Sequence, residues 1–302
     1  MKILMIGATG FVGSSLVARL AAAGHDLLVA TRRRERARHL IVLPTVRVVE
    51  ADIHDEATLE QLMQGQDAVI NLVGILKGGT GKPYGAGFVR AHVELPTKIV
   101  HAMQRCGVRR LLHMSALHAG ADAPSGYLRS KAAGEKVLLA KRAALDVTVF
   151  RPSVIFGRGD AFLTLFAQLQ AIAPFVPLAC PDAQFQPVWV EDVTRVMAAS
   201  LADAASVGKS YDLCGPTVYR LRQLVAYAGR LAGHARPILG LSNGFSMLQA
   251  WAMEFVPGGP MTRDNVRSMQ LPSICASACG LPFGVAATPL EAIAPSYLAV
   301  PA

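Results

Sequence analysis

Short apolar runs alternate, over the first half of the chain, with longer segments in which apolar residues recur every three or four positions. The runs have the length of β-strands and cover residues 3–6, 27–30, 46–49, 68–73, 111–114 and 146–150. The periodic segments between them are typical of amphipathic helices and lie near residues 11–20, 56–63, 88–106 and 127–142. This alternation predicts a parallel sheet with helices on both faces, because parallel neighbours need crossover connections.

The alternation weakens after Arg151, where helices are expected from Glu191 or Asp192 to Leu201 and over 221–231. We therefore predict an α/β fold, a Rossmann-type doubly wound parallel sheet with a smaller C-terminal α+β substrate region. The dinucleotide-binding domain is expected in residues 1–153, and it can regain later segments such as 187–215. Residues 154–302 are expected to form the smaller, discontinuous region for a substrate or partner.

Two uncharged stretches stand out in this second half. Residues 161–181 include Pro174 and Pro177, which argue against a membrane-spanning helix and favour a buried lid or an apolar substrate wall. Residues 237–253 include Trp251 and predict a packed helix, with a surface that docks on a membrane or a partner as the alternative. Their apolar character favours a lipophilic small-molecule substrate or neighbour.

Composition excludes intrinsic disorder, because 52% of the 302 residues are hydrophobic and 17% are charged. The net charge of +9 is uneven: residues 1–150 hold 20 basic and 12 acidic side chains, and residues 151–302 hold 10 and 9. Residues 1–150 therefore carry most of the positive charge, and this half of the chain is expected to bind a polyanionic cofactor. Nucleic acid is not expected as a partner, because the densest basic run has no interleaved aromatic residues.

The five cysteines form no Cys-x-x-Cys pair and are odd in number, which favours a reducing compartment. Cys275 and Cys279 are interpreted as two small core residues rather than as a metal or redox pair. No secretory signal precedes the first strand, so a cytoplasmic location is expected, with membrane association left open. No metal site is expected, since the histidines lack ligand spacing, and the oligomeric state is not predicted.

Three glycines at a spacing of three follow the first strand and precede the first helix. Gly7 suits a tight turn, Gly10 suits the close approach of the backbone to a pyrophosphate, and Gly13 suits close packing of helix on strand. The anion would sit where the free N–H groups and the positive end of the helix dipole point. The opening segment therefore predicts a dinucleotide site.

The end of the second strand favours NADP over NAD. Thr31, Arg32 and Arg33 offer a hydroxyl and guanidinium groups suited to a 2′-phosphate, whereas an acidic side chain there would bind the ribose hydroxyls of NAD. The alternative is that residues 33–38 form only a solvated helix face. After the third strand, Asp52 is placed to meet the adenine amino group or to cap a turn, and both roles stay open.

Tyr127 and Lys131 lie four residues apart on a predicted helix, so they share one face. A lysine ammonium beside a phenol is expected to lower the pKa of that phenol, so that Tyr127 can exchange a proton with a substrate oxygen near neutral pH. The same lysine can hydrogen-bond the nicotinamide ribose. Ser115, at the end of the fifth strand, would hold the substrate carbonyl and stabilise charge on its oxygen.

Together these motifs make the chain resemble the short-chain dehydrogenase/reductase superfamily, in the extended and atypical branches that include NAD(P)-dependent epimerases and dehydratases. The resemblance implies that Ser115, Tyr127 and Lys131 form the catalytic triad and that the turn beginning at Pro152 closes on the nicotinamide. The residues expected to bind the cofactor are Gly7, Thr9, Gly10, Phe11, Val12, Gly13, Thr31, Arg32, Arg33, Asp52, Ile53, Leu72, Val73, Gly74, Tyr127, Lys131, Pro152, Ser153 and Val154.

A narrower resemblance involves residues 127–135, 187–193 and 260–266. These segments are similar to the group that includes the dehydrogenase-like accessory subunit of respiratory complex I and its bacterial relatives. That group implies cofactor binding and contact with a respiratory complex or a membrane, with little turnover, whereas the intact Ser115, Tyr127 and Lys131 favour an oxidoreductase acting on a carbonyl or alcohol. A sugar-nucleotide epimerase or dehydratase is a further alternative, and the basic end of the second strand argues against it.

Overall fold

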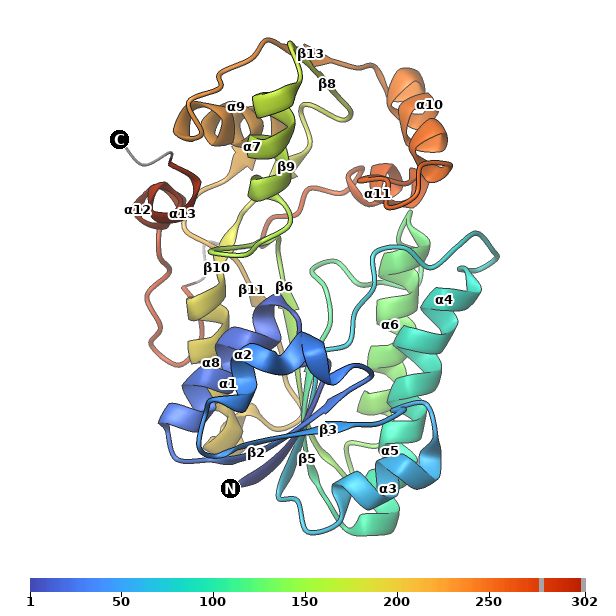
Figure 1. Cartoon of the computed structure of the whole chain (residues 1–302). Helices are drawn as coiled ribbons and strands as arrows, with labels where there is room; N and C mark the ends of the chain where they lie inside the picture. Colours follow the sequence, from blue (N-terminus) through green and yellow to red (C-terminus); the bar gives the residue numbers. More distant parts are fainter. Residues whose placement is uncertain (277–279, 300–302) are drawn as a thin grey trace.

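A seven-stranded parallel sheet forms the lower half of the molecule in the computed structural model, which describes residues 1–276 and 280–299 (Figure 1). The strand order is β11-β6-β5-β4-β1-β2-β3, which confirms the predicted doubly wound sheet. Its strands are β1 (Lys2–Ile6), β2 (Asp26–Thr31), β3 (Val46–Glu50), β4 (Ala68–Asn71), β5 (Arg110–Met114), β6 (Asp146–Pro152) and β11 (Ser210–Leu213).

Helices cover both faces of the sheet, so the central strands are buried on each side and contain almost only apolar residues (Figure 1). One face packs against α1 and α8, with α2 at its margin, and the other packs against α3, α5 and α6. These helices are α1 (Phe11–Ala22), α2 (Arg38–Ile41), α3 (Glu56–Met63), α5 (Leu95–Cys106), α6 (Gly126–Leu139) and α8 (Val190–Ala202).

The helix predicted over residues 88–106 is interrupted. It consists of α4 (Ala86–Phe88), a π-helical stretch Val89–Glu94 and then α5. Pro96 lies in the first turn of α5, directly after the π-helical stretch, and Gly107 closes the helix with a left-handed conformation. Widened π-helical turns are frequent at functional sites, and this one carries a buried histidine described below.

The chain returns to the sheet after leaving it at Pro152. Strand β6 is two residues longer than the apolar run indicated, and β11 pairs with it in parallel. Helix α8 packs on α1, and the Arg19 guanidinium donates to Glu191 Oε2 at 2.5 Å across this contact. Segments on either side of residue 153 therefore share one sheet.

The second region lies above the carboxyl ends of the strands in Figure 1 and contains short helices with two-stranded pairings. The strand pairs are β7 (Ile155–Phe156) with β10 (Val188–Trp189), β8 (Val176–Leu178) with β13 (Ile238–Gly240), and β9 (Gln184–Phe185) with β12 (Tyr219–Arg220). The helices are α7 (Leu163–Ile172), α9 (Leu221–Leu231), α10 (Asn243–Glu254), α11 (Arg263–Ser268), α12 (Leu290–Ile293) and α13 (Pro295–Leu298).

The prediction of a packed helix for residues 237–253 is wrong, because the helix that forms there exposes its large apolar side chains. Helix α10 forms there, but Phe245, Leu248 and Trp251 are exposed, while Ser246 and Ala250 face inward. Apolar composition alone does not distinguish a buried helix face from an exposed one. Within the described ranges, no helix combines the length and the hydropathy needed to cross a membrane.

A disulfide corrects the interpretation of the cysteines. Cys214, which directly follows β11, is bonded to Cys275, 61 residues later in the chain. Cys275 is therefore not a plain core residue, and the argument from cysteine usage for a reducing compartment loses its support. Cys279 lies outside the described residues. The bond ties the segment around Cys275 to the carboxyl edge of the sheet.

Candidate cofactor and catalytic site

The glycine turn between β1 and α1 has the geometry that its sequence indicated. Gly7 has a φ of +79°, and a Cβ there would lie 2.9 Å from the Val73 nitrogen, so both conformation and space require glycine. A Cβ on Gly13 would lie 2.4 Å from Ala8 Cα, which shows how closely α1 packs on the turn. The first turn of α1 is thereby held at the edge of the sheet.

Gly10 has open space beside it among the residues that the structure describes. It is exposed, its φ of −83° suits any residue, and a Cβ there would meet only Gly7 O of these residues, at 3.6 Å. Gly10 also precedes α1, whose first N–H groups have no intrahelical partners. This edge therefore fits the pyrophosphate of a dinucleotide.

The end of β2 presents a buried threonine and exposed arginines. Thr31 Oγ1 donates to Arg33 O at 3.1 Å and accepts from Arg33 N at 3.3 Å, so the chain turns sharply after the strand. The side chains of Arg32 and Arg33 point into solvent. His39 on α2 was not singled out from the sequence; its Nε2 lies 2.8 Å from Ser14 Oγ on α1, close to the glycine turn.

The ends of the next two strands carry polar side chains that shape turns. Asp52 Oδ1 accepts from His54 N at 2.9 Å, so Asp52 does cap a turn. Asn71 is buried, and its Oδ1 accepts from Val73 N at 3.1 Å, which fixes the segment that leads to Gly74. The other predicted cofactor residues on this edge, each within three residues after a strand or in the first turn of α1, are Thr9, Phe11, Val12, Ile53, Leu72 and Val154.

Lys131 lies in the centre of this edge. Only 3% of it is exposed, and its Nζ donates to Met114 O at 3.0 Å and to Val73 O at 3.2 Å, the residues that end or follow β5 and β4. A Cβ on Gly74 would lie 3.3 Å from this Nζ. An ammonium has three N–H donors, and two are bonded within residues 1–276 and 280–299, so one donor remains there for a ligand beside Gly74.

Burial controls the charges around Lys131. It lowers the pKa of Lys131 to about 8, against a smaller opposite effect of Glu135. Burial, together with the nearby ammonium, lowers the pKa of His113 to about 3 and that of His92 to about 2. Both histidines are therefore neutral at physiological pH, and Lys131 is the cationic group between them.

The prediction that Lys131 lowers the pKa of Tyr127 is wrong for the protein alone. Burial of the phenol raises its pKa to about 12. The Tyr127 ring packs edge-on against His92, with ring centroids 5.7 Å apart, and against Phe88 at 6.1 Å. The phenol of Tyr127 therefore carries its proton at neutral pH.

His92 connects the π-helical stretch to the helix that carries Tyr127. Its Nε2 accepts from Ile75 N at 3.1 Å, so the proton of the neutral ring is assigned to Nδ1, which lies 2.8 Å from Ser130 Oγ. Ser130 in turn donates to Tyr127 O at 2.7 Å. Sequence reasoning missed His92, and the only signal for it was the proline at position 96, which hinted at an irregular helix.

Ser115 directly follows β5 and is buried, and its Oγ has no hydrogen-bond partner in the part of the chain that the structure describes. A buried hydroxyl without a partner costs free energy, so a ligand that supplies the missing bond would recover it. Tyr127 packs against the small cluster that contains Ala116, the neighbour of Ser115. The structure thus brings Ser115, Tyr127 and Lys131 to one edge of the sheet.

Asp264 is a second residue that sequence reasoning did not assign to the site. Its carboxylate accepts from Gly126 N at 2.7 Å and from Tyr127 N at 2.9 Å, so it binds the first N–H groups of α6. A carboxylate there complements the positive end of the helix dipole. The motif at 260–266 contained Asp264. No local sequence pattern, however, indicates that it contacts Tyr127, which lies 137 positions away in the chain.

Helix α6 is also tied to the sheet beyond Lys131. Glu135 is buried and accepts from Arg151 Nε at 2.9 Å and 3.1 Å, which holds α6 on β6. After Pro152, Ser153 Oγ donates to Ser273 O at 2.7 Å. The segment secured by the disulfide therefore lies against the turn expected to face the nicotinamide.

Comparison with known proteins agrees with this geometry. Residues 3–214 match the model of the NAD dependent epimerase/dehydratase family. The chain is 32% identical over 229 residues to mouse mitochondrial NADH dehydrogenase (ubiquinone) 1 alpha subcomplex subunit 9, a match that covers 74% of this chain but only 59% of the mouse protein. It is 30% identical over 197 residues to a ceramide reductase of Caulobacter vibrioides, covering 65% of this chain and 60% of that protein.

Solved structures share the fold at lower sequence identity. A dTDP-glucose 4,6-dehydratase from Streptomyces venezuelae, solved with NAD bound, has a TM-score of 0.70 and 22% identity over 81% of this chain and 86% of its own. A nucleoside-diphosphate-sugar epimerase from Staphylococcus aureus has a TM-score of 0.72 and 16% identity over 92% of both chains. These likenesses concern the fold, and the predicted resemblance to the complex I accessory subunit group is confirmed by the sequence relatives.

Proposed function

The chain belongs to the NAD dependent epimerase/dehydratase family, and we propose that it is an NADP-dependent oxidoreductase that acts on the carbonyl or alcohol of a lipophilic small molecule. The observation that carries the proposal is the buried Lys131 ammonium, which uses two of its three N–H donors in the described part of the chain and lies beside Gly74. Burying a cation with an unpaired N–H donor costs folding free energy. A ligand bound there would supply the missing acceptor and explains why the lysine is buried at this place.

Each side chain has a distinct role in the proposed reaction. NADPH, when bound, supplies the hydride. Tyr127 donates its proton to the carbonyl oxygen, Ser115 donates a hydrogen bond to the same oxygen, and Lys131 binds the nicotinamide ribose. The reduced substrate leaves as an alcohol with the carbon–oxygen double bond converted to a single bond. At neutral pH the phenol of Tyr127 carries the proton that the reduction of a carbonyl requires.

The preference for NADP rests on the exposed side chains of Arg32 and Arg33 after β2. Guanidinium groups match the 2′-phosphate of NADP, which NAD lacks. Titration of NADPH and NADH into the wild type and into a variant with Arg32→Ala and Arg33→Ala tests this point. We expect the wild type to prefer NADPH and the variant to lose that preference, and equal affinities in the wild type would contradict it.

The lipophilic substrate is supported by two relatives, the ceramide reductase and the sterol demethylase protein B of Methylococcus capsulatus, whose names denote lipid substrates. A panel of long-chain ketones and sterols, compared with short polar carbonyl compounds, therefore tests the substrate class. A sugar-nucleotide epimerase or dehydratase remains the less favoured enzyme, because the arginines after β2 are unlike the acidic residue that binds the ribose of NAD.

Tyr127→Phe is the test of the catalytic assignment. The variant keeps the ring that packs on His92 and Phe88 but lacks the proton donor, so turnover should fall by roughly 10² to 10⁴ while NADPH affinity stays near that of the wild type. Tyr211→Phe, on the outer strand β11, where the ring packs on Phe150 and Phe283, serves as the control. Unchanged turnover in Tyr127→Phe would discard the assignment.

A second candidate function is a cofactor-loaded assembly or sensor protein that contacts a respiratory complex. It is favoured by the similarity to the mouse complex I subunit, which is named as a subunit of NADH dehydrogenase. In that case NADPH should raise the melting temperature through ligand linkage, while no carbonyl compound is reduced. Either candidate is consistent with a protein that associates with a membrane.

A further inference from the structure

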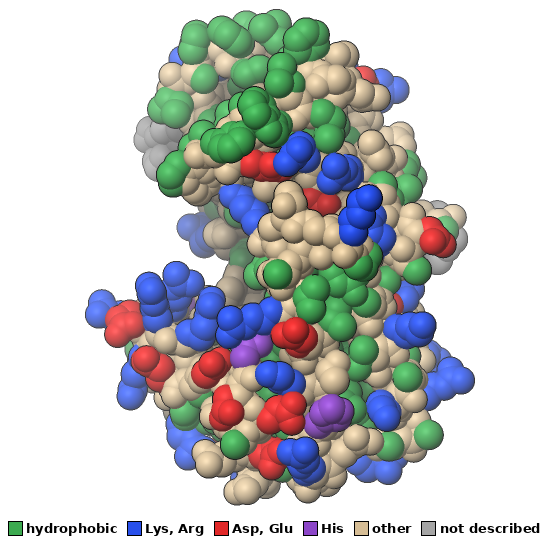
Figure 2. All heavy atoms as spheres, turned by 90° about the vertical axis from the view of Figure 1, so that its right-hand side faces the viewer, with side chains coloured by type: hydrophobic (Ala, Val, Ile, Leu, Met, Phe, Trp, Pro, Cys, Tyr) green, Lys and Arg blue, Asp and Glu red, His purple; other side chains and the backbone are tan. Residues whose placement is uncertain are grey.

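Residues 271–275 contact both halves of the molecule, and we call them the edge segment. Leu271 and Tyr127 pack against the same small apolar cluster at the edge of the sheet. Two positions later, Ser273 forms a parallel β-bridge with Phe185 of β9, in the second region. The two halves differ in surface character, because Figure 2 shows charged side chains gathered over the lower half and hydrophobic ones at the opposite end. The edge segment therefore joins two dissimilar parts beside the proposed catalytic tyrosine.

Hydrogen bonds fix the edge segment on the side of the second region. Ser273 N donates to Gln184 O at 2.8 Å, and Gln186 N donates to Ser273 O at 2.9 Å. Cys275 N donates to Gln186 Oε1 at 3.0 Å, and the amide of the same side chain donates to Gly215 O at 2.7 Å. Strand β9 and the residue after it thus hold the edge segment from one side.

Two more hydrogen bonds fix the edge segment on the side of the sheet. Ser153 Oγ donates to Ser273 O, and His118 Nε2 donates to Ile274 O at 3.0 Å. His118 has a φ of +60°, which residues other than glycine rarely adopt, and such a conformation persists only where surrounding contacts impose it. Because His118 lies three positions after Ser115, the edge segment and the loop that begins at Ser115 hold each other in place.

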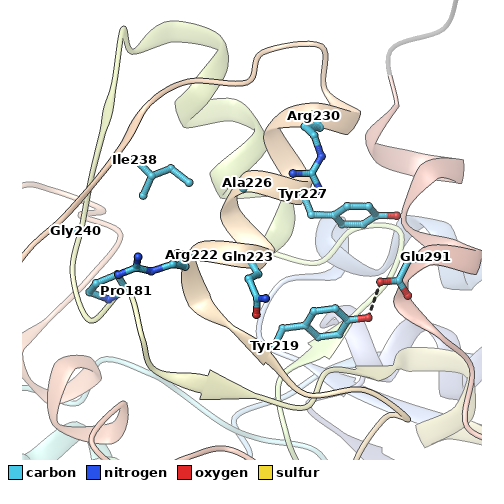
Figure 3. A pocket seen from close by; sticks show the side chains of 10 residues that line it. All are labelled: Pro181, Tyr219, Arg222, Gln223, Ala226, Tyr227, Arg230, Ile238, Gly240 and Glu291. Carbon is cyan, nitrogen blue, oxygen red and sulfur yellow. Dashed lines mark hydrogen bonds between the residues drawn. The ribbon is translucent and has the colours of Figure 1, made fainter.

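The disulfide between Cys214 and Cys275 secures the C-terminal end of the edge segment. It closes a loop that contains α9, β13, α10 and α11. This loop supplies most of the wall of a cavity of about 560 Å³ in the second region (Figure 3). Closing so long a loop covalently restricts the chain strongly. One bond therefore fastens the edge segment and much of the second region to the sheet.

We propose that this disulfide is a redox switch of the catalytic site, an inference that rests on the proposed oxidoreductase function. With the bond formed, the edge segment holds the loop after Ser115 and the turn at Ser153 in the arrangement that carries the reaction. With the bond reduced, only hydrogen bonds hold the segment, and each contributes little net free energy. The segment then detaches for part of the time, and turnover falls.

A dithiol is the reductant for this switch. One of its thiolates attacks the sulfur of Cys275, the more exposed of the two cysteines, and forms a mixed disulfide. The Cys214 thiolate is released and takes up a proton. The second thiol of the reductant then displaces Cys275, so the protein gains two thiols and the reductant leaves as a cyclic disulfide. Two electrons and two protons thus pass from the dithiol to the protein.

Reduction under native conditions tests the proposal. A variant with Cys106→Ser, Cys180→Ser and Cys279→Ser keeps only the bonded pair of the five cysteines. We expect dithiothreitol to lower its turnover of a carbonyl substrate by at least about tenfold, because small displacements of catalytic groups are costly. Hydrogen exchange at the amides of residues 273 and 275 should become faster. Reoxidation with diamide should reverse both changes.

NADPH binding separates the switch from the nucleotide site. Its affinity should stay near that of the oxidised protein, because the Lys131 ammonium is held by the ends of β4 and β5. If the oxidised protein shows no turnover with any carbonyl compound, the proposed function fails, and the exchange rates alone then decide whether the disulfide holds the edge segment. Exchange rates at residues 273 and 275 that are equal in the oxidised and reduced protein would overturn the proposal.

Three further variants complete the test. Cys214→Ser with Cys275→Ser should behave like the reduced protein and ignore dithiothreitol. His118→Asn tolerates the left-handed backbone but shortens the donor to Ile274 O, so it should lower turnover with the disulfide intact. The matched control is Arg230→Gln, in the same closed loop, where the guanidinium lies over the Tyr227 ring (Figure 3). It should change neither turnover nor the response to dithiothreitol.

The opposite result would assign the disulfide a purely structural role. In that case reduction would lower the melting temperature, while turnover below the melting transition would stay that of the oxidised protein, and the proposal would be overturned. Higher turnover after reduction would overturn it as well, because the edge segment would then obstruct the site rather than organise it. If the variant lacking both bonded cysteines does not fold, reduction of the folded triple variant still decides between these results.

Discussion

Helices α6 and α10 have similar lengths, 14 and 12 residues, but they place their side chains in opposite ways. Helix α6 buries a lysine and a glutamate, and each is bonded to groups of the sheet. Helix α10 exposes its aromatic residues and buries a serine. Most helices of soluble proteins bury apolar side chains and expose charged ones. Both helices depart from this distribution, which is the one that stability favours.

The two departures have different physical consequences. Buried charges in α6 are held by hydrogen bonds, so their removal disturbs both the fold and any chemistry at the sheet edge. Exposed apolar groups in α10 contribute little to the fold, because they gain no burial in the protein alone. Substitutions in α6 should therefore cost stability, whereas substitutions in α10 should cost only binding to whatever covers it.

The largest effect is expected for Glu135→Gln. The change leaves the Arg151 guanidinium without its buried partner, and breaking such a pair costs about 3 kcal/mol of unfolding free energy. Urea denaturation measures the loss. Glu60→Gln, which breaks a more exposed pair with Arg105 on the same face of the sheet, is the control and should change stability by less than about 1 kcal/mol. Equal losses in the two variants would contradict the difference between buried and exposed pairs.

The pH dependence of stability should depend on Lys131. Its folded pKa of about 8 lies below its ordinary value of 10.5, so the unfolded chain binds more protons between these two pH values. Stability should therefore rise with pH across this window, by up to about 3 kcal/mol, and this contribution should be flat below pH 8. Lys131→Met removes the effect, so the difference between the two denaturation profiles isolates it. A constant difference from pH 7 to 10.5 would count against a depressed pKa.

Asp264→Ala should have an intermediate effect. It removes two charge-assisted bonds to the start of α6, at a cost of about 2 kcal/mol. The second bond is to the backbone N–H of Tyr127, so its loss should also disturb the position of the phenol. Turnover should therefore fall by more than the decrease in folded protein accounts for. Asp55→Ala removes the comparable cap of α3, away from the site, and should lower stability by about 1 kcal/mol without a change in turnover. Similar activity in both variants would remove Asp264 from the site.

The smallest effect is expected in α10. Phe245→Ser with Phe255→Ser should change the free energy of unfolding by less than about 0.5 kcal/mol, because both side chains are exposed. Thermal and urea denaturation in the absence of lipid check this. A clear loss of stability would mean that α10 packs more tightly than its exposure indicates, and the contrast with α6 would fail.

The parts of the molecule that sequence predicts are those fixed by local pattern. The glycines at 7, 10 and 13 follow a strand at fixed spacing, and the four-residue step from Tyr127 to Lys131 places both on one helix face. The parallel sheet, and the edge at which its strands end, then follow from the alternation of strands and helices. These features need no knowledge of distant contacts.

The parts that sequence missed depend on distant contacts or on environment. Asp264 meets α6 across 137 positions, and Cys214 meets Cys275 across 61, so neither pairing has a local signature. The pKa of Tyr127 rises because burial disfavours the phenolate, opposite to the lowering that the sequence led us to expect from Lys131. The apolar face of α10 was read as packed, since hydropathy does not say which side of a helix is covered.

The central claim is that a dinucleotide lies over the glycine turn, beside Lys131. Gly10→Ala tests it most directly, because the added Cβ fits the protein alone, with its nearest contact at 3.6 Å, but intrudes on the space assigned to the pyrophosphate. Calorimetric titration should show that NADPH affinity falls at least about tenfold while the melting temperature without nucleotide stays near that of the wild type. Unchanged affinity for NADPH in this variant would contradict the account.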